Sequence, residues 1–337
     1  MINAGIIGYG YWGPNILRNF QEHPELEVKI VCDYSNSRLD SVSAKYPSIK
    51  TSKKTDYIFN DKKINLVAII TPLSSHYELA KKALLNNKHV FVEKPFTATS
   101  DQAKELIDLA EKKNLLIMVD HTFLFNSTVL KIKDLLDKGE LGNLFYYDSI
   151  RVNLGKFQQD VNVIWDLAPH DLSILNFLIN DIKPISINAI GSKNILNGQE
   201  DVAYLHLQYE NNLTANLHVN WLSPVKIRQS IFAGDKKMLL WDDISNDEKI
   251  KVYDKGVDAQ NKKGLFELQV NYRSGDMWSP KVDYQEALKT QTNHIVNCIK
   301  RNEKPISSGI EGLKVVNILE ASEKSIKNKG MEIKITE

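Results

Sequence analysis

The chain has 337 residues, of which 42% are hydrophobic and 25% charged, a composition typical of a globular protein. Its 43 lysine and arginine residues nearly balance its 42 aspartate and glutamate residues, and the formal net charge of +1 gives no general attraction to nucleic acid or to an anionic membrane. The two cysteines, Cys32 and Cys298, are too few for a disulfide framework or for a zinc site built on cysteines.

The N-terminal residues pass directly into a strand-like segment, without the basic and apolar leader that is typical of a secreted protein. The longest apolar runs, such as 66–70 and 115–119, are far shorter than the ~20 residues with which a helix crosses a bilayer. We therefore expect a cytoplasmic protein with no membrane partner. At about 150 residues per domain, the length predicts two domains.

Short apolar strands alternate with helical segments over the first 122 residues. The predicted strands are 2–7, 28–32, 66–70, 89–92 and 115–119, and the predicted helices are 14–20, 75–86 and 101–113. Ser100 is the expected N-cap of the last of these helices. Apolar strands that are separated by helices indicate a parallel sheet covered on both faces. Residues 1–122 are therefore predicted to form a doubly wound α/β domain.

The pattern changes after residue 122, where several strands show period-two alternation. The predicted strands are 145–152, 202–209, 214–221, 227–233, 238–241 and 249–253, with turn signals at 210–212 and 234–235. Strands joined by tight turns form antiparallel sheets, and their alternation leaves one face open. Residues 123–337 are predicted to form an α+β domain for substrate binding and oligomerisation, with a large, mostly antiparallel open sheet. Late helices at 284–301 and 309–329 close the chain, and the last is a candidate to pack back on the first domain.

A glycine-rich loop follows the first predicted strand. Gly8-Tyr9-Gly10-Tyr11-Trp12-Gly13 fits the pattern G-x-G-x-x-G and opens a helix, while Asp33 lies 20 residues beyond Gly13, at the end of the next strand. Such a loop lets the backbone approach a pyrophosphate at a helix N-terminus, and the acidic residue binds ribose hydroxyls. This context favours a dinucleotide-binding Rossmann domain over a plain packing loop. Asp33 favours NAD, whereas Arg38 is the one neighbour that favours the 2′-phosphate of NADP.

A lysine stands at the end of the predicted strand 89–92. The segment Val90-Phe91-Val92-Glu93-Lys94-Pro95 carries Lys94 to the carboxyl edge of the sheet, where open α/β sheets bind ligands. Pro95 restricts the backbone beside it. The pattern predicts a cation that faces bound substrate, and a surface lysine at a strand exit is the alternative.

Asp166 and His170 are four residues apart in the second domain. On a helix they share one face, where a carboxylate can orient an imidazole that acts as a general base. Pro169 interrupts the helical pattern, so the helix is alternatively expected to begin near Pro169. A capping histidine and a metal pair are the other interpretations. Because no third ligand stands at metal spacing, we predict no metal.

These motifs in this order resemble the Gfo/Idh/MocA oxidoreductase family. The resemblance covers essentially the whole chain, including 309–316 and the helix that follows. It implies an NAD(P)-dependent dehydrogenase or reductase that acts on a sugar, a cyclitol or a related hydroxyl–carbonyl pair. The chain departs from many relatives at Glu286-Ala287-Leu288, where Glu-Pro-Leu is common, and this puts the local turn in doubt.

The resemblance also assigns roles to individual residues. Lys94 would contact the reacting oxygen, with a cis peptide bond before Pro95, His170 would be the acid/base and Asp166 its partner. The expected cofactor contacts are Gly8, Gly10, Tyr11, Trp12, Gly13, Asp33, Thr71, Pro72, His76, Glu93 and Lys94. The candidate substrate contacts are Arg151, Asn153 and Trp165, with Arg273 as a further polar candidate.

Three segments, 10–15, 165–171 and 274–280, resemble family members encoded in surface-polysaccharide gene sets. Similar proteins are assigned as UDP-N-acetylglucosaminuronate 3-dehydrogenases, which prepare a 3-keto sugar for an aminotransferase. The resemblance therefore implies NAD-dependent oxidation of a nucleotide-linked sugar at C3 by a homodimer or homotetramer. The alternatives are a free-sugar or inositol dehydrogenase, an NADPH-dependent keto-sugar reductase and a non-enzymatic NAD-binding regulator.

Overall fold

The computed structural model describes residues 1–155, 157–158, 160–179, 182–195, 198–260 and 269–335. The chain forms two compact units, of which the first comprises Met1–Asn126 with Gln285–Glu320 and the second Ser127–Tyr284 with Ala321–Thr336. These units differ from a simple division at residue 122, because 285–320 returns to the first unit. That segment packs there through helix α8 beside α1 and through Ser307, whose carbonyl accepts from the Val119 amide.

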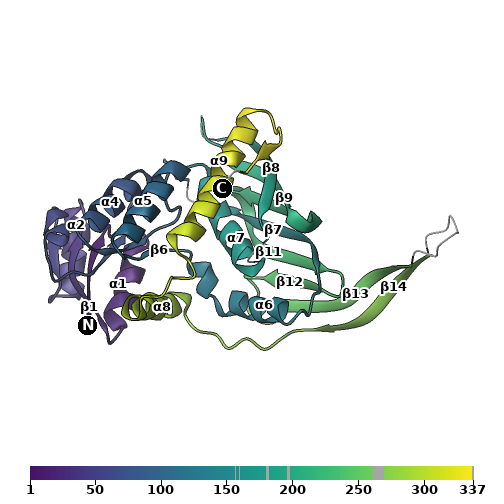
Figure 1. Ribbon diagram of the computed structural model, residues 1–337, viewed down its shortest axis with the longest axis horizontal. Helices are drawn as coiled ribbons and strands as arrows, with labels where there is room; N and C mark the ends of the chain where they lie inside the picture. The colour runs from purple at the N-terminus through teal and green to yellow at the C-terminus, as the bar shows by residue number, and fades with distance from the viewer. Residues whose placement is uncertain (156, 159, 180–181, 196–197, 261–268, 336–337) are drawn as a thin grey trace. The chain divides into compact units, whose positions relative to one another are not determined.

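The first unit, drawn mostly in purple and blue in Figure 1, is built on a six-stranded parallel sheet with the order β3-β2-β1-β4-β5-β6. Its strands are β1 (Ile2–Ile7), β2 (Leu26–Cys32), β3 (Lys50–Ser52), β4 (Leu66–Ile69), β5 (His89–Val92) and β6 (Ile117–Val119). Its helices are α1 (Gly13–Glu22), α2 (Asn36–Lys45), α3 (Asp56–Phe59), α4 (His76–Leu85), α5 (Ser100–Lys112) and α8 (Ala287–Arg301), with short turns η1 (Leu73–Ser75) and η2 (Thr122–Phe125). The strand order reverses at β1, so the connections after β1 and after β4 lie on opposite faces of the sheet. The predicted doubly wound α/β fold is confirmed.

One predicted helix cap is wrong. Helix α5 begins at Ser100, and the residue that caps it is Thr99, whose side chain accepts a hydrogen bond from the Gln102 amide. Ser100 instead donates its hydroxyl to the Glu320 carboxylate at 2.7 Å. The serine therefore links α5 to α9 (Gly309–Lys327), a contact over 220 residues of sequence that local patterns do not encode.

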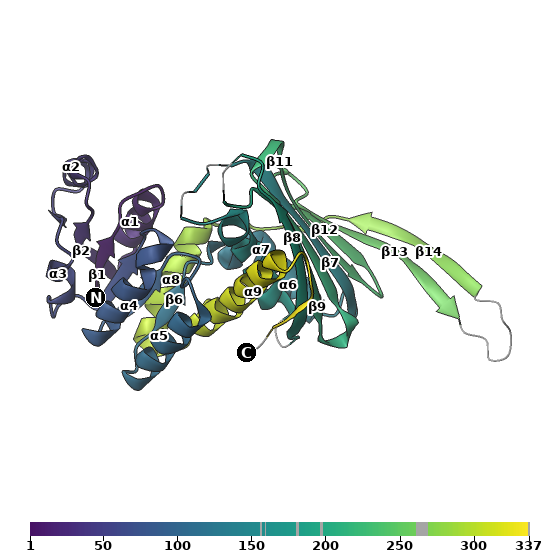
Figure 2. The ribbon, with the colours of Figure 1, turned by 90° about the horizontal axis from the view of Figure 1, so that it is seen from above.

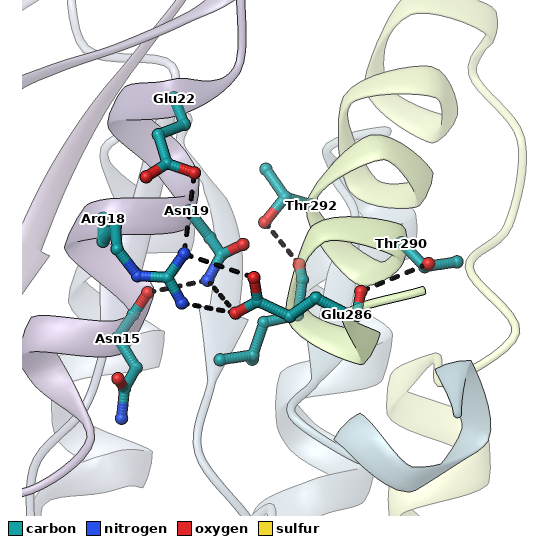
Figure 3. Close-up of polar contacts among 8 residues, drawn as sticks. Asn15, Arg18, Asn19, Glu22, Glu286, Thr290 and Thr292 are labelled. Carbon is teal, nitrogen blue, oxygen red and sulfur yellow. Dashed lines mark hydrogen bonds and ion pairs between the residues drawn. The ribbon is translucent and has the colours of Figure 1, made fainter. Parts of the chain in front are cut away.

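A carboxylate joins helices α1 and α8. Figure 3 shows Glu286, the residue before α8, with its carboxylate directed at Arg18 and Asn19 of α1. Glu286 accepts from the Arg18 guanidinium through both oxygens and from Asn19 Nδ2 at 3.1 Å. The turn that Ala287 put in doubt is simply the start of α8, with Glu286 in an extended conformation as its N-cap.

The second unit is built on a nine-stranded sheet with the order β14-β13-β12-β11-β7-β10-β9-β8-β15. Its strands are β7 (Leu144–Leu154), β8 (Pro184–Ser192), β9 (Val202–Tyr209), β10 (Thr214–Asn220), β11 (Leu222–Gly234), β12 (Met238–Asp242), β13 (Ile250–Gln260), β14 (Gln269–Trp278) and β15 (Ile333–Lys334). The pair β7–β10 is parallel, and the other described pairs are antiparallel. The mostly antiparallel sheet is thus confirmed. Strands β8, β14 and β15 were not predicted.

Helices α6 (Ser127–Asp137) and α7 (Val163–Ile179) lie on one face of this sheet (Figure 2). Alternate residues on the opposite face are more exposed, including Ile150, Ile190 and Tyr204. The predicted turn between β9 and β10 holds Asn211 and Asn212 at φ 64° and 61°, a left-handed conformation that asparagine tolerates. In the described part of the chain, no helix has the length and apolar character that crossing a membrane requires.

The α1–α8 contact predicts a pH-dependent stability. Hydrogen bonding to Arg18 holds the pKa of Glu286 below its usual value. Because both side chains are partly exposed, we expect Glu286→Gln to lower the free energy of unfolding at neutral pH by about 0.5–1 kcal/mol. The full difference in the free energy of unfolding should be present above the pKa of glutamate in the unfolded chain. It should vanish as pH falls through the lower pKa of Glu286 in the folded protein.

Denaturant unfolding of both proteins between pH 3 and 8 measures this difference. Glu111→Gln, at an exposed glutamate of α5 in the same unit, is a matched control for charge removal alone. A Glu286→Gln difference that stays constant over this pH range would contradict the prediction.

Candidate active site

The glycine loop has the geometry that a bound pyrophosphate needs. Gly8 has φ +97°, and a Cβ there would lie 2.2 Å from the Ile70 carbonyl oxygen. A Cβ on Gly13, the first residue of α1, would lie 2.9 Å from the Gly8 oxygen. At Gly10, by contrast, a Cβ would meet no atom closer than the Arg38 guanidinium at 3.9 Å. The first and last glycines thus close the turn, while Gly10 leaves space for a ligand beside the helix N-terminus.

Asp33 directly follows β2 and is tied to this loop. One carboxylate oxygen accepts from the Tyr9 amide at 2.7 Å, and the other accepts from the Ser35 amide at 2.8 Å. Arg38 lies 3.3 Å from the first oxygen. Burial raises the pKa of Asp33, but these hydrogen bonds and the Arg38 charge outweigh it and hold the pKa below the usual value. The side chain is therefore ionised at neutral pH and ready to accept bonds from hydroxyl groups.

The loop after β4 is held by a buried histidine. His76, 1% exposed, places Nδ1 2.9 Å from the Pro95 carbonyl oxygen and Nε2 2.8 Å from the Thr71 carbonyl oxygen. Thr71 also accepts from the Ser75 hydroxyl at 2.7 Å. His76 therefore supports the loops after β4 and β5, and its direct contact with a cofactor stays a prediction, as do those of Pro72, Tyr11 and Trp12.

Lys94 stands at the carboxyl edge of the same sheet. It follows β5 by two residues, and the peptide bond between Lys94 and Pro95 is cis, as expected. Glu93 is buried beside it and accepts the Lys94 backbone amide at 2.9 Å. The loop, Asp33, Thr71, Glu93 and Lys94 thus all follow strands of one parallel sheet at one edge.

Asp166 and His170 both lie on α7 in the second unit. The alternative in which the helix begins near Pro169 is wrong, since α7 begins at Val163 and contains Pro169. Asn162 explains the early start, because its side-chain oxygen accepts from the Ile164 and Trp165 amides and caps the helix. A helical spacing of four residues places Asp166 and His170 on one face.

A tryptophan that the sequence analysis did not single out orients Asp166. Trp221, which follows β10 and is 1% exposed, donates its indole N–H to Asp166 Oδ2 at 3.0 Å. Because an indole N–H can only donate, this bond fixes the position of the accepting carboxylate oxygen. The spacing between Asp166 and His170 carried no signal for this partner, which comes from 55 residues away.

The candidate substrate residues have different surroundings within the second unit. Arg151 forms a buried two-point ion pair with Asp171 of α7, at 2.8 and 2.9 Å. Trp165 is 6% exposed and donates its indole N–H to Glu323 at 2.8 Å. These contacts support structural roles for Arg151 and Trp165. Asn153, two residues after Arg151 on β7, shares its sheet face and is partly exposed.

Two family models match the chain. Residues 2–121 match a family described as an oxidoreductase family with an NAD-binding Rossmann fold, and residues 129–239 match the GFO/IDH/MocA C-terminal domain. The chain belongs to the Gfo/Idh/MocA family of oxidoreductases. The resemblance inferred from the motifs is thereby confirmed.

Individual relatives match only part of the chain. The uncharacterized oxidoreductase YdgJ of Escherichia coli K12 is 35% identical over 182 residues, which cover 50% of this chain and 51% of that protein. The scyllo-inositol 2-dehydrogenase (NADP(+)) IolW of Bacillus subtilis is 27% identical over 225 residues, which cover 61% and 59%. The chain thus spans little more than half the length of these two curated relatives.

Similarity to a solved structure extends over nearly the whole chain. UDP-N-acetylglucosamine 3-dehydrogenase GnnA from Acidithiobacillus ferrooxidans aligns with a TM-score of 0.81 at 21% identity. The alignment covers 97% of this chain and 98% of that chain. At this identity the likeness shows a shared two-unit fold.

The open space at Gly10 gives a test of the dinucleotide site. Gly10→Ala should fold with unchanged thermal stability but bind NAD at least about tenfold more weakly, because its Cβ occupies the space left for the ligand. Gly8→Ala should instead lose thermal stability, because its Cβ meets the Ile70 carbonyl at a positive φ. Calorimetric titration with NAD and thermal unfolding measure the two effects. Equal NAD affinity in Gly10→Ala and the unaltered protein would place the dinucleotide elsewhere.

Proposed function

We propose that this chain is an NAD-dependent dehydrogenase that oxidises a hydroxyl group of a sugar. The proposal depends on one observation. Lys94 lies at the same edge of the parallel sheet as the glycine loop and Asp33. The second unit supplies a carboxylate and an imidazole on one helix face, Asp166 and His170. A bare dinucleotide-binding regulator needs neither the lysine nor this pair.

In the proposed mechanism, one group of residues accepts the proton and another stabilises the negative charge. His170 accepts the hydroxyl proton, and Asp166, oriented by Trp221, stabilises the resulting imidazolium. The Lys94 ammonium stabilises the oxygen as it becomes anionic, a contribution of about 3–4 kcal/mol for a preorganised donor. Bound NAD supplies the acceptor for the hydride that leaves the same carbon.

NAD is favoured over NADP by the carboxylate at the end of β2. The ionised Asp33 repels a 2′-phosphate and accepts bonds from a free 2′-hydroxyl. Arg38 is the neighbour that favours NADP, but it is paired with Asp33 and half-exposed. The name of IolW includes NADP(+), and this relative supports the NADP alternative.

The proposed substrate is a nucleotide-linked sugar of the UDP-N-acetylglucosaminuronate type, oxidised at C3 in surface-polysaccharide biosynthesis. It is supported by the resemblance of three segments to such family members and by the shared fold of GnnA, which is named for a related UDP-sugar. The second candidate is an inositol or free-sugar dehydrogenase, favoured by the name of IolW. We also propose a homodimer or homotetramer formed through the exposed sheet face that carries Ile150, Ile190 and Tyr204.

Product analysis distinguishes the substrates. The protein is incubated with NAD, and in parallel with NADP, and a panel of UDP-sugars, free hexoses and inositols. We expect a UDP-uronate alone to lose two mass units, and mass spectrometry of the sugar detects this even when the reduced cofactor stays bound. Oxidation of inositol or a free hexose instead would replace the proposed substrate and retain the chemistry. Failure of every substrate, with NAD binding demonstrated, would support the regulator.

Lys94 provides the sharpest test of the chemistry. We expect Lys94→Ala to lower kcat by about 10²–10³, because the developing oxyanion loses its donor, while NAD still binds. Steady-state kinetics and NAD titration measure the two properties. Lys53→Ala, at an exposed lysine remote in sequence from the motifs, is the matched control. A Lys94→Ala variant with near-normal turnover would remove Lys94 from the mechanism.

A further inference from the structure

Two carboxyl groups are buried together at the ends of β5 and β6. Val92 and Val119 pair in the last register position of these strands, and the Asp120 amide donates to the Val92 carbonyl at 2.7 Å. Glu93 and Asp120 therefore leave the sheet side by side, with 7% and 3% of their surfaces exposed. Two carboxylates in such surroundings repel each other strongly unless a proton is retained.

The hydrogen bonds show where this proton belongs. Asp120 Oδ1 accepts from the Thr122 hydroxyl and from Gln291 Nε2, the latter at 2.9 Å. Glu93 Oε2 accepts from the Lys94 amide. The remaining oxygens, Glu93 Oε1 and Asp120 Oδ2, are buried and receive no N–H or O–H from another described group, and the two carboxyls contact each other. Two carboxyl oxygens in contact require a proton between them, since ionised carboxylates only accept.

The two partners are not equivalent. Asp120 accepts two side-chain donors and is therefore better stabilised as an anion than Glu93, which accepts one backbone amide. Burial raises the pKa of Glu93 well above its usual value, and the nearby charge of Asp120 raises it further. Burial also raises the pKa of Asp120, against the hydrogen bonds from Thr122 and Gln291.

Among the described residues around the pair, Lys94 supplies a positive charge and the two carboxyls supply one negative charge once a proton is retained. The Lys94 ammonium interacts electrostatically with both carboxyls. His121, next to Asp120, is 1% exposed, and burial lowers its pKa to about 3, so it is neutral at physiological pH. From α8 the group that contacts the pair is the uncharged amide of Gln291. With neutral Glu93, Asp120 carries the charge that faces Lys94.

We propose that Glu93 is a neutral acid that donates its proton to Asp120, and that ionised Asp120 is a positioning residue that holds the Lys94 ammonium in place. Its catalytic meaning rests on the proposed function of Lys94. The shared proton is a property of the protein without cofactor or substrate. It can therefore be tested independently of the proposed function.

Infrared spectroscopy of the unliganded protein tests the proton. At pH 8, where ordinary carboxyl groups are ionised, the unaltered protein should show the carbonyl stretch of a protonated carboxylic acid, with the small shift in D₂O that an exchangeable proton causes. Glu93→Gln should remove this band, and Asp120→Asn should retain it at a changed frequency. Glu105→Gln, at an exposed glutamate, should change nothing.

The spectrum of the unaltered protein needs no variant to fold, and absence of the band overturns the proposal. A band that Asp120→Asn removes and Glu93→Gln retains assigns the proton to Asp120 and overturns it as well. Circular dichroism establishes that each variant is folded before its spectrum is compared.

Chemical labelling tests the effect on Lys94. Acetic anhydride reacts with neutral amines, and the peptides are quantified by mass spectrometry with exposed Lys53 as the internal reference. Asp120→Asn should accelerate acetylation of Lys94 by about tenfold, because the ammonium loses the negative charge that faces it. Glu93→Gln replaces a neutral group with a neutral group and should leave this rate nearly unchanged. Equal rates in the two variants would show that Asp120 has no such role, whereas a general loosening of the site would accelerate both.

Discussion

The functional residues of the first unit depend on one constraint, that all strands of a parallel sheet present their carboxyl ends at the same edge. Five strands, β1, β2, β4, β5 and β6, are each followed within two residues by a residue of the candidate site or its surroundings. Those residues are Gly8, Asp33, Thr71, Lys94 and Asp120. The edge is also where helix N-termini offer free N–H groups, so the proposed dinucleotide and the proposed catalytic cation would meet there without any long loop to hold them.

The residues of the second unit that we propose for catalysis lie on one helix that is anchored at several points. Asn162 caps α7, the Arg151–Asp171 ion pair fixes it to β7, and Trp165 ties its first turn to Glu323. Breaking a buried ion pair of this kind typically costs about 3–5 kcal/mol, because one charge is left without a partner. Such anchoring makes α7 a rigid support for Asp166 and His170. Rigid placement is what a general base and its carboxylate partner require.

Buried polar groups near the proposed chemistry are arranged so that few net charges remain. Arg151 and Asp171 neutralise each other, His121 is neutral, and Glu93 shares a proton with Asp120 in our interpretation. Charges are expensive to bury without a partner, and each of these arrangements avoids that cost.

The sequence by itself determined the doubly wound first unit, the antiparallel second sheet, the glycine loop with Asp33, and the lysine at the end of β5. These features follow from periodicity and from spacings within about 25 residues, which local geometry converts directly into position. Only the tertiary structure decided that Trp221 orients Asp166 and that Arg151 pairs with Asp171. It also decided that Gln291, from a helix near the end of the chain, completes the surroundings of Asp120. Each of these partners is chosen by packing between segments, and side-chain packing leaves no periodic signal in the sequence.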